Sequence, residues 1–293
     1  MKKSRFALLV LTLTAVSALA GCSNGKTNVK NDAETTAQAA EATTLATDSI
    51  TYSYTSADST ISSSVTIDYP TGTDSLSLAV RRIIGDKLAD QALSNIANET
   101  PKRPNYTGDI NNGQAMADFF GKCNTEELKK QKKEDDSHDP DMRMSYDVKV
   151  KKELETAKYI SLSITSEAYL GGAHGSATGF NTLISKQSRS EVKYTVDSTK
   201  LKELQPLLKE GVVSYFKEMG EADVTTSNIG DYLIIEGGTI PLPVNAPYFA
   251  ADGVHFIYQQ YEIAPYAAGM VGFVIPFDKI KPYLTPEAQK LLD

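Results

Sequence analysis

The alternation of hydrophobic and polar residues predicts several β-strands separated by clustered helices. A period of two is typical of strands with one buried face. The segments that show it are 50–54, 61–69, 144–150, 160–164, 178–185, 254–258 and 271–275. We expect 144–150 and 160–164 to pair as antiparallel strands. Two further stretches, 229–235 and 239–244, are possible strands within the irregular region 220–253.

Helical spacing of apolar residues predicts the remaining elements. One helix is expected to begin near Leu76, with Asp74 or Ser75 as its N-cap. A second is expected to follow a loop over 101–113 and to end in the solvated charge run 129–136. Shorter helices are expected at 200–208, 211–219 and 277–284, and a last one after Thr285 and Pro286. This order of elements predicts an α+β fold with antiparallel sheets and clustered helices.

The first residues are typical of a bacterial secretory signal. Lys2, Lys3 and Arg5 precede an apolar run over 6–20 that is too short to span a bilayer comfortably. The run ends in Leu-Ala-Gly-Cys22, which resembles a lipobox, in which the cysteine becomes the lipidated first residue of the mature chain. The alternative is an ordinary signal peptide with a cysteine there by chance. We expect acyl chains on Cys22 to hold the protein on a membrane.

Composition predicts four segments along the chain. Residues 1–21 form the signal peptide, and the Ser-, Thr- and Ala-rich residues 22–48 form a flexible tether because they cannot bury enough apolar surface to fold. An N-terminal α+β domain is expected over 49–140 and a C-terminal α+β domain over 141–293, although the two could share a core. The expected location is the cell envelope, at the outer membrane or the outer face of the cytoplasmic membrane.

The charge of the chain narrows the possible partners. The full sequence has a formal charge of −7, and removal of residues 1–21 leaves 27 Lys and Arg against 37 Asp and Glu. An acidic surface repels phosphate backbones, so we expect no nucleic-acid partner. It suits a cationic protein, although acidity is also a common means of remaining soluble.

A tyrosine-rich stretch, Tyr258-Gln-Gln-Tyr-Glu-Ile-Ala-Pro-Tyr-Ala-Ala-Gly269, lies between two predicted strands. Its rings Tyr258, Tyr261 and Tyr266 are candidates for binding or for the core. Glu262 stands between two apolar side chains, and a buried carboxylate needs partners. We expect it to accept hydrogen bonds from backbone N–H groups, a tyrosine or His174, or else to act as a general acid or base with His174.

The second candidate is the turn Gly171-Gly-Ala-His-Gly175, which follows Tyr169. Its glycines, including Gly172, either form the turn alone or let a ligand approach His174 closely. No further metal-ligand spacing supports a metal site, and His255 is expected to be an ordinary sheet residue. We therefore predict a binding surface made of Tyr169, Gly172, His174, Tyr258, Tyr261 and Tyr266.

Other sequence features are less informative. The segment Asp135–Asp141 superficially resembles a calcium loop but lacks its glycine and final glutamate. The chain has no phosphate-binding loop and no nucleophile elbow, and we expect no cofactor. Cys123 shares a helical pattern with apolar residues, so a small buried hydrophobic residue is favoured over a reactive thiol.

The two loops together resemble a bacterial family. The sequences Tyr169-Leu-Gly-Gly-Ala-His-Gly175, 258–269 and Val274-Ile-Pro-Phe277 resemble domain of unknown function 3298, and 50–140 resemble domain of unknown function 4163 more weakly. The resemblance implies an α+β fold whose C-terminal domain is similar to a subdomain of the Hsp70/actin ATPases, without ATP hydrolysis. Relatives occur beside a polysaccharide deacetylase domain and as the extracellular part of lysozyme-sensing anti-sigma factors.

Neither of those roles is carried over, because we find neither a deacetylase metal motif nor a transmembrane or sigma-binding segment in the sequence. The leading hypothesis is a non-enzymatic envelope lipoprotein that binds a cell-wall component or a secreted protein. A cationic, lysozyme-like protein or a peptidoglycan fragment is the expected partner. The alternative hypothesis is a hydrolase that acts on cell-wall glycan through His174 and Glu262.

Overall fold

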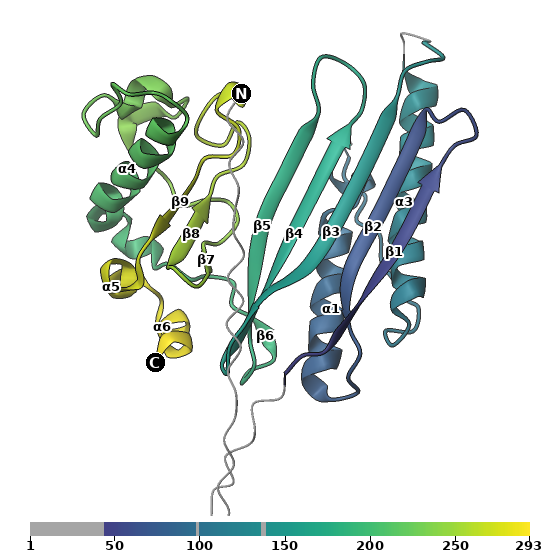
Figure 1. Ribbon diagram of the computed structural model, residues 1–293, viewed down its shortest axis with the longest axis horizontal. Helices are drawn as coiled ribbons and strands as arrows, with labels where there is room; N and C mark the ends of the chain where they lie inside the picture. Colours follow the sequence, from purple (N-terminus) through teal and green to yellow (C-terminus); the bar gives the residue numbers. More distant parts are fainter. Residues whose placement is uncertain (1–43, 98–99, 136–138) are drawn as a thin grey trace, which may run out of the picture. The chain divides into compact units, whose positions relative to one another are not determined.

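A six-stranded mixed β-sheet is the framework of the fold (Figure 1). The computed structural model describes residues 44–97, 100–135 and 139–293. The strands follow one another in space in the order of the chain: β1 (Thr47–Thr55), β2 (Ile61–Pro70), β3 (Met144–Glu155), β4 (Tyr159–Tyr169), β5 (Ser176–Ser185) and β6 (Ser190–Glu191). The expected signal peptide, Cys22 and all but the last residues of the tether lie outside the described residues.

The connection between β2 and β3 makes the sheet mixed. These two strands are parallel, with Ile61 opposite Met144 and Ile67 opposite Val150, whereas all other neighbours are antiparallel. Parallel neighbours need a long crossover. Helices α1 (Ser75–Asp90), α2 (Leu93–Ile96) and α3 (Gly113–Glu134) provide it.

The long helices α1 and α3 lie on one face of the sheet (Figure 1). Alternate strand residues, such as Val65, Tyr146 and Ile164, point to that side and are buried with the helices. We call the opposite side the outer face. Small hydroxyl side chains and charges dominate it: Thr51, Ser53, Ser62, Ser64, Thr66, Ser145, Asp147, Lys149, Ser163, Thr165 and Glu167.

The C-terminal residues form a second group of elements beside the sheet. A small antiparallel sheet contains β7 (Tyr248–Phe249), β8 (Val254–Ile257) and β9 (Gly272–Ile275). The helices are α4 (Leu201–Glu218), α5 (Phe277–Ile280) and α6 (Pro286–Leu292). Their apolar core also contains Tyr159 and Leu183 from β4 and β5, so this group packs directly against the larger sheet.

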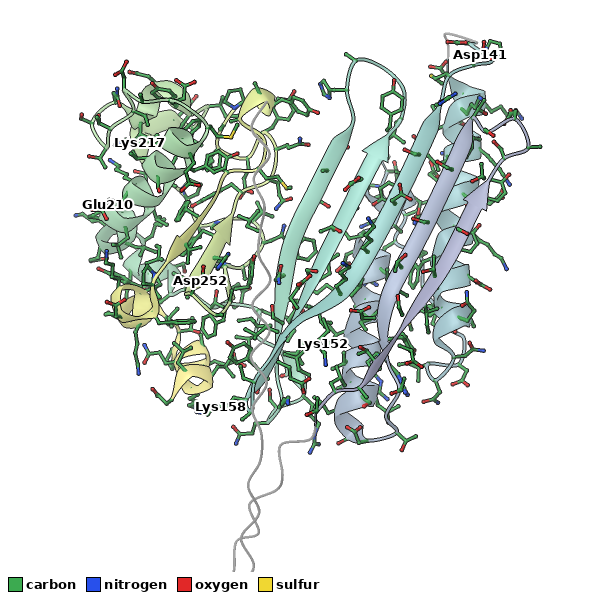
Figure 2. All side chains as sticks on the ribbon, in the orientation of Figure 1. Asp141, Lys152, Lys158, Glu210, Lys217 and Asp252 are labelled. Carbon is green, nitrogen blue, oxygen red and sulfur yellow. The ribbon has the colours of Figure 1, made fainter. Side chains whose placement is uncertain are left out.

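A half-buried carboxylate at the end of β3 fixes the beginning of the described chain. Glu155 accepts hydrogen bonds from the backbone N–H of Leu45 at 2.8 Å, from Nζ of Lys186 at 2.6 Å and from Nζ of Lys152 at 2.9 Å. Lys152 is labelled in Figure 2. Burial would raise the pKa of Glu155, but these hydrogen bonds outweigh it and lower the pKa below its usual value.

Many of the predicted elements are confirmed. β3 and β4 are antiparallel, and the strands expected on either side of the tyrosine-rich stretch pair as β8 and β9. Asp74 caps α1 by accepting from the N–H groups of Leu76 and Ser77. Thr285 caps α6 through the N–H of Ala288. The α+β class is therefore correct, and the expectation of antiparallel sheets is corrected to a mixed sheet by the β2–β3 pair.

The predicted ends of the helices in 113–134 and 201–218 differ from those in the structure. α3 continues through the charge run to Glu134, because Leu128 is buried and Lys129 and Lys130 pair with Glu126 and Glu127 one turn away. The two helices expected over 200–219 are one helix, α4. Its buried stripe continues past Pro206, the sixth residue of the helix, although proline cannot donate a helical hydrogen bond there.

Two further predictions are also corrected. Residues 229–235 and 239–244 contain short 3-10 turns and irregular segments instead of strands. The helix expected over 277–284 divides into α5 and a 3-10 turn. The domain boundary expected at residue 140 lies in the crossover between the paired strands β2 and β3, and the division into two domains stays a prediction. None of the helices in the described ranges is long and apolar enough to cross a membrane.

Candidate functional site

The β4–β5 hairpin presents His174 in a glycine-rich loop. Gly171 and Gly172 have φ angles of +89° and +87°, a region that favours glycine. The hydroxyl of Tyr169 donates to the carbonyl of Gly172 at 3.0 Å, and Nδ1 of His174 lies 3.1 Å from the carbonyl oxygen of Gly175. The imidazole itself is exposed. These contacts make the loop an ordered turn with an accessible ring at its tip.

The tyrosine turn, residues 258–269, is held in shape by Glu262. One carboxylate oxygen accepts from the N–H of Val244 and the other from the N–H of Gln259, each at 2.6 Å. Tyr261, next to it, has a φ of +64°, which is uncommon for a residue with a side chain. The carboxylate therefore satisfies backbone donors at a bend whose backbone is strained.

The hairpin and the tyrosine turn meet. The ring of Tyr266 stacks on His174 with centroids 3.9 Å apart, and its hydroxyl donates to the carbonyl of Gly175 at 2.8 Å. Tyr261, which is 57% exposed, lies beside Tyr266, and the centroids of these two rings are 5.7 Å apart. The two loops thus form one aromatic surface made of Tyr169, His174, Tyr261 and Tyr266.

Two glutamine side chains attach the tyrosine turn to the edge of β5. The side-chain carbonyl of Gln260 accepts from the N–H of Ala177 at 3.1 Å. Gln259 accepts from the N–H of Gly179 at 3.1 Å and donates to the carbonyl of Gly179 at 3.0 Å. These amides replace the next strand of the ladder. They therefore cover backbone groups that an edge strand would otherwise leave unpaired.

A cavity of about 290 Å³ opens beside the aromatic surface. Strands β3, β4 and β5 and the tyrosine turn all contribute to it. Its lining residues are Ser145, Asp147, Glu167, Ala168, Tyr169, Gly175, Ser176, Ala177, Gln260 and Tyr266. We call it the acidic pocket, because its only ionisable side chains other than tyrosine are two carboxylates.

Those two carboxylates face each other across neighbouring strands. Asp147 on β3 is directly opposite Glu167 on β4, an arrangement that is unfavourable for like charges. The hydroxyl of Ser64 donates to Asp147. Neither carboxylate has a Lys or Arg partner within the described part of the chain, and Lys149, two positions from Asp147, pairs with neither. The pocket therefore carries uncompensated negative charge next to two aromatic rings.

The predicted binding residues divide into two groups. Tyr169, His174, Tyr261 and Tyr266 come together at the surface, with Gly172 in the same loop. Tyr258 does not belong there. It is fully buried, and its hydroxyl donates to the carbonyl of Pro241 at 2.8 Å. As the last residue before the turn it continues the buried positions of β8, so it belongs to the core.

The predicted pairing of His174 with Glu262 is absent from the described residues. His174 stacks on Tyr266, and both oxygens of Glu262 are occupied by backbone N–H groups. A general acid–base pair would need hydrogen-bond contact or a shared water. The geometry agrees with the structural interpretation of Glu262, in which the carboxylate shapes the turn.

Sequence reasoning missed Asp147, Glu167 and Gln260. The two acids occupy polar positions of alternating strands, which by themselves only indicate an exposed face. Their proximity depends on the register of β3 and β4, which the sequence does not specify directly. The available signal was that both lie on the same side of strands expected to be antiparallel.

Metal and thiol chemistry find little support. Within 44–97, 100–135 and 139–293, no group of three or more His, Cys, Asp or Glu side chains could hold a metal ion. The superficial calcium loop lies partly outside the described residues, because 136–138 are not among them. Cys123 is half-buried on α3, and burial raises the pKa of its thiol, so the reactive thiolate is disfavoured.

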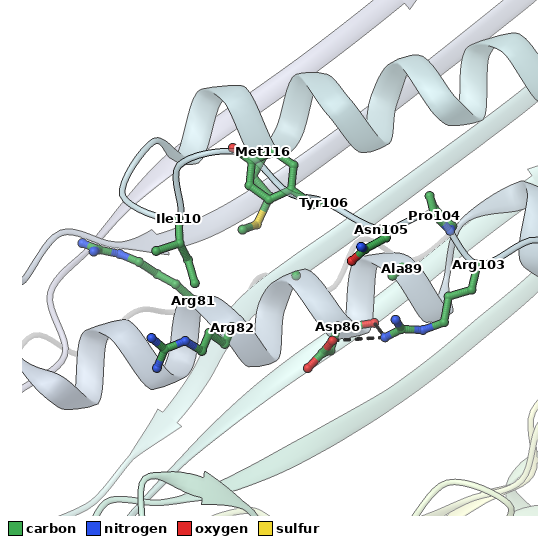
Figure 3. A pocket seen from close by; sticks show the side chains of 12 residues that line it. Arg81, Arg82, Asp86, Ala89, Arg103, Pro104, Asn105, Tyr106, Ile110 and Met116 are labelled. Carbon is green, nitrogen blue, oxygen red and sulfur yellow. Dashed lines mark hydrogen bonds and ion pairs between the residues drawn. The ribbon is translucent and has the colours of Figure 1, made fainter.

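Another cavity, of about 310 Å³, lies between α1 and the loop that precedes α3 (Figure 3). Ile110, Met116 and Tyr106 form its apolar wall. Two of its arginines already serve the fold: Arg103 pairs with Asp86 at 3.2 Å, and Arg81 donates to backbone carbonyls and to the side chain of Asn111. Arg82, which also lines the cavity, is exposed. The acidic pocket is the leading site because Asp147 and Glu167 lie directly opposite each other there and because it adjoins the aromatic surface formed by the two predicted loops.

The fold and this surface define an α+β protein with a mixed six-stranded sheet and a recessed acidic, aromatic site. Comparison with known families adds an assignment to each part. Residues 195–278 match a family described as a protein of unknown function, DUF3298, and residues 54–177 match Deacetylase PdaC. The chain is thus similar to DUF3298 proteins over 195–278 and to Deacetylase PdaC over 54–177. No curated protein matches it.

Solved structures agree with the fold. A DUF3298 family member from Bacteroides fragilis has a TM-score of 0.61 at 18% identity, over 84% of this chain and 97% of that chain. A DUF3298 family protein from Pseudomonas aeruginosa has a TM-score of 0.54 at 11% identity, over the same shares, 84% and 97%. At these identities the likeness concerns the fold alone.

Proposed function

We propose that this protein is a membrane-anchored envelope lipoprotein whose acidic pocket binds a cationic secreted protein of the lysozyme type. The observation that carries the proposal is the pair Asp147 and Glu167, directly opposite each other without a basic partner in the described ranges. A Lys or Arg side chain entering the pocket would neutralise both carboxylates. Tyr169 and Tyr266 would then lie beside its charge, where aromatic rings attract cations.

The proposed anchor is Cys22, acylated after removal of residues 1–21, with 22–48 as the tether to the folded part. The contacts of Leu45 with Glu155 and Lys152 support an ordered end to that tether. Mass spectrometry of the mature N-terminus tests the anchor directly. We expect a diacylated or triacylated cysteine, and Cys22→Ala should release the protein from the membrane fraction.

The alternative, a glycan hydrolase using His174 and Glu262, is less well supported because the two side chains share no hydrogen bond in the described residues. Several finer parts of the family resemblance also remain proposals. They are the kinship of the upstream region with domain of unknown function 4163, that of the C-terminal domain with Hsp70/actin subdomains, and the relation to lysozyme-sensing proteins.

The binding proposal is tested by measuring lysozyme affinity at low and high salt with the tether truncated before Leu45. The double variant Asp147→Asn/Glu167→Gln should bind at least about 10-fold more weakly at low salt, because two desolvated charge contacts are lost. High salt should also weaken lysozyme binding by the unmodified protein, because it screens the attraction between opposite charges. Peptidoglycan fragments, the other predicted partner, are titrated in parallel.

A matched control removes the same charge elsewhere. Asp278→Asn/Glu287→Gln changes two exposed carboxylates at the starts of α5 and α6, and it should leave lysozyme affinity within about 2-fold. Equal weakening by both double variants would mean that net charge, and no defined pocket, attracts lysozyme. Binding of peptidoglycan fragments alone would refute the protein partner.

A further inference from the structure

A larger cavity lies on the outer face of the sheet, where β3, β4 and β5 meet β7. Its volume is about 440 Å³, within the range of small-molecule sites. The lining residues are Glu153, Leu154, Ser161, Ser163, Thr165, Asn181, Tyr248, Phe249, Ala250 and Ala251. We call it the β7 cavity. It shares no lining residue with the acidic pocket.

The polar groups of the β7 cavity can both donate and accept hydrogen bonds. Ser163 donates to Glu153 at 2.7 Å, and the amide of Asn181 donates to Ser161 at 3.0 Å. Thr165 is exposed, and its hydroxyl makes no hydrogen bond with another described side chain or backbone group. Hydroxyl and amide groups with remaining hydrogen-bonding capacity therefore come from two neighbouring strands, β4 and β5.

The charges of the cavity exclude anionic ligands. Glu153 is the only charged residue that lines it, and Asp252 stands just outside, after Ala251 (Figure 2). No lysine or arginine is among the lining residues. A phosphate or carboxylate would therefore meet a carboxylate without a compensating cation, which is unfavourable.

The wall opposite the strands is held firmly in place. Tyr248 lies beside His255, with ring centroids 5.1 Å apart, and Nε2 of His255 is 2.7 Å from a carboxylate oxygen of Asp252. Gly253 has a φ of +154°, and a Cβ there would be 2.5 Å from the carbonyl oxygen of Ile275. The turn between β7 and β8 therefore lies close against β9. The half-buried Tyr248 lines the cavity together with Ala250 and Ala251.

We propose that the β7 cavity binds a neutral sugar unit of a glycan. Sugar hydroxyls both donate and accept, as do the side chains of Ser163, Thr165 and Asn181. The apolar face of a sugar ring can pack on Tyr248, as ligands do on aromatic residues in such sites. A peptide is less suitable, since the backbone groups of β4 are already paired with β3 and β5 and offer no ladder for a further strand.

The test is a titration of the folded chain with two neutral tetrasaccharides, β-1,4-linked N-acetylglucosamine and β-1,4-linked glucose, followed by NMR and calorimetry. We expect at least one of them to bind in the millimolar range or more tightly, with shifts at Thr165 and Asn181. Thr165→Ala and Asn181→Ala should each weaken binding about 5-fold, the loss typical of one hydrogen bond. Tyr248→Ala should weaken it more, and Tyr248→Phe, which keeps the ring, should bind nearly normally.

The control Thr51→Ala changes a hydroxyl on the same outer face but on β1, and it should not alter binding. The proposal is overturned if neither tetrasaccharide shifts the cavity residues, or if Thr165→Ala and Asn181→Ala bind as well as the unmodified chain. Equal binding of a galacturonic acid tetramer would also overturn it. Asp147→Asn/Glu167→Gln should leave sugar binding intact, so this test is independent of the lysozyme experiment.

Discussion

At the scale of single residues, Glu262 illustrates what a sequence can and cannot tell. An acid between Tyr261 and Ile263 needs partners, and hydrogen bonds from backbone N–H groups were among the expectations. The sequence could not identify the donors, because one of them, Val244, lies 18 residues earlier in an irregular segment. Tyr258 was placed in the predicted binding surface for a related reason: tyrosine occurs both in cores and on binding surfaces, and its sequence context does not separate the two.

We predict that Glu262→Gln destabilises the protein by about 1–3 kcal/mol, measured as a shift in the urea unfolding midpoint. Glutamine has a single side-chain oxygen, so one of the two N–H groups now bound at 2.6 Å would lose its acceptor. His174→Ala removes only an exposed stacking partner, and it should cost less than about 1 kcal/mol. If the two variants proved equally stable, the structural role given to Glu262 would be wrong.

At the scale of elements, α3 and β1 pack closely because the helix has a glycine, Gly121, where Tyr52 of the strand lies against it. A Cβ on Gly121 would lie 2.0 Å from Cδ1 of Tyr52, and the hydroxyl of Tyr52 bonds to Thr125 one turn further along α3. Helical periodicity predicted α3 but gave no reason for a glycine in its interior, where glycine is normally unfavourable. The reason is the close approach of the strand.

We therefore predict that Gly121→Ala destabilises the protein by about 1–3 kcal/mol, despite the better helix propensity of alanine. The matched control is Gly85→Ala in α1, where the nearest atom to the new Cβ would be Cε of Met116 at 3.4 Å. That variant should be neutral or up to about 1 kcal/mol more stable. Thermal unfolding of both variants checks the contrast, and a loss of equal size in both would contradict it.

The ion cluster at the end of β3 predicts a dependence of stability on pH. The pKa of Glu155 is lower in the folded protein than its usual value, so its contribution is fully present above the unfolded pKa and is lost as pH falls through the folded pKa. We expect the urea midpoint to fall between about pH 5 and pH 3, and to fall less steeply in Glu155→Gln. Exposed Glu287→Gln should retain the full slope, and an unchanged slope in Glu155→Gln would refute the assignment.

At the scale of the whole molecule, the sequence predicted the class of fold better than its connections. Clear alternation identified β3, β4, β8 and β9, because each has one buried face and one that is less buried. It could not predict the parallel pairing of β2 with β3, since strand direction depends on how the intervening helices return the chain. The irregular character of 220–253 was predicted, but the course of its backbone was not, because tertiary contacts such as those of Gln205 with Ile240 fix it.

The candidate site was predicted to the same partial extent. The sequence identified the two loops that meet, through their glycines and tyrosines, and His174 and Tyr266 do stack. It did not identify the acidic pocket, whose members come from β3 and β4 and become neighbours only through strand register. Side chains on an exposed strand face give no signal of their own until the pairing is known.

The glutamines of the tyrosine turn lead to a prediction about how the two groups of elements are joined. Gln259→Ala/Gln260→Ala removes the side chains that cover the β5 edge. Amide hydrogen exchange at Ala177 and Gly179 should accelerate at least about 10-fold, with a smaller effect on global stability. Gln205→Ala, which affects the bonds to Ile240, should leave those two amides protected, and unchanged exchange in the double variant would contradict the proposed attachment.

The parallel pairing of β2 with β3 has a consequence for how the chain acquires its structure. Ile61 and Met144 can become neighbours only after the more than eighty residues between them have been synthesised. The same holds for Ile67 and Val150 at the other end of this strand pair. During synthesis from the amino end, the edge of β2 that later pairs with β3 therefore stays unpaired throughout that interval. The chain is then prone to aggregation and proteolysis. Chaperones would have their greatest effect on this protein in that interval, before β3 is available to pair with β2.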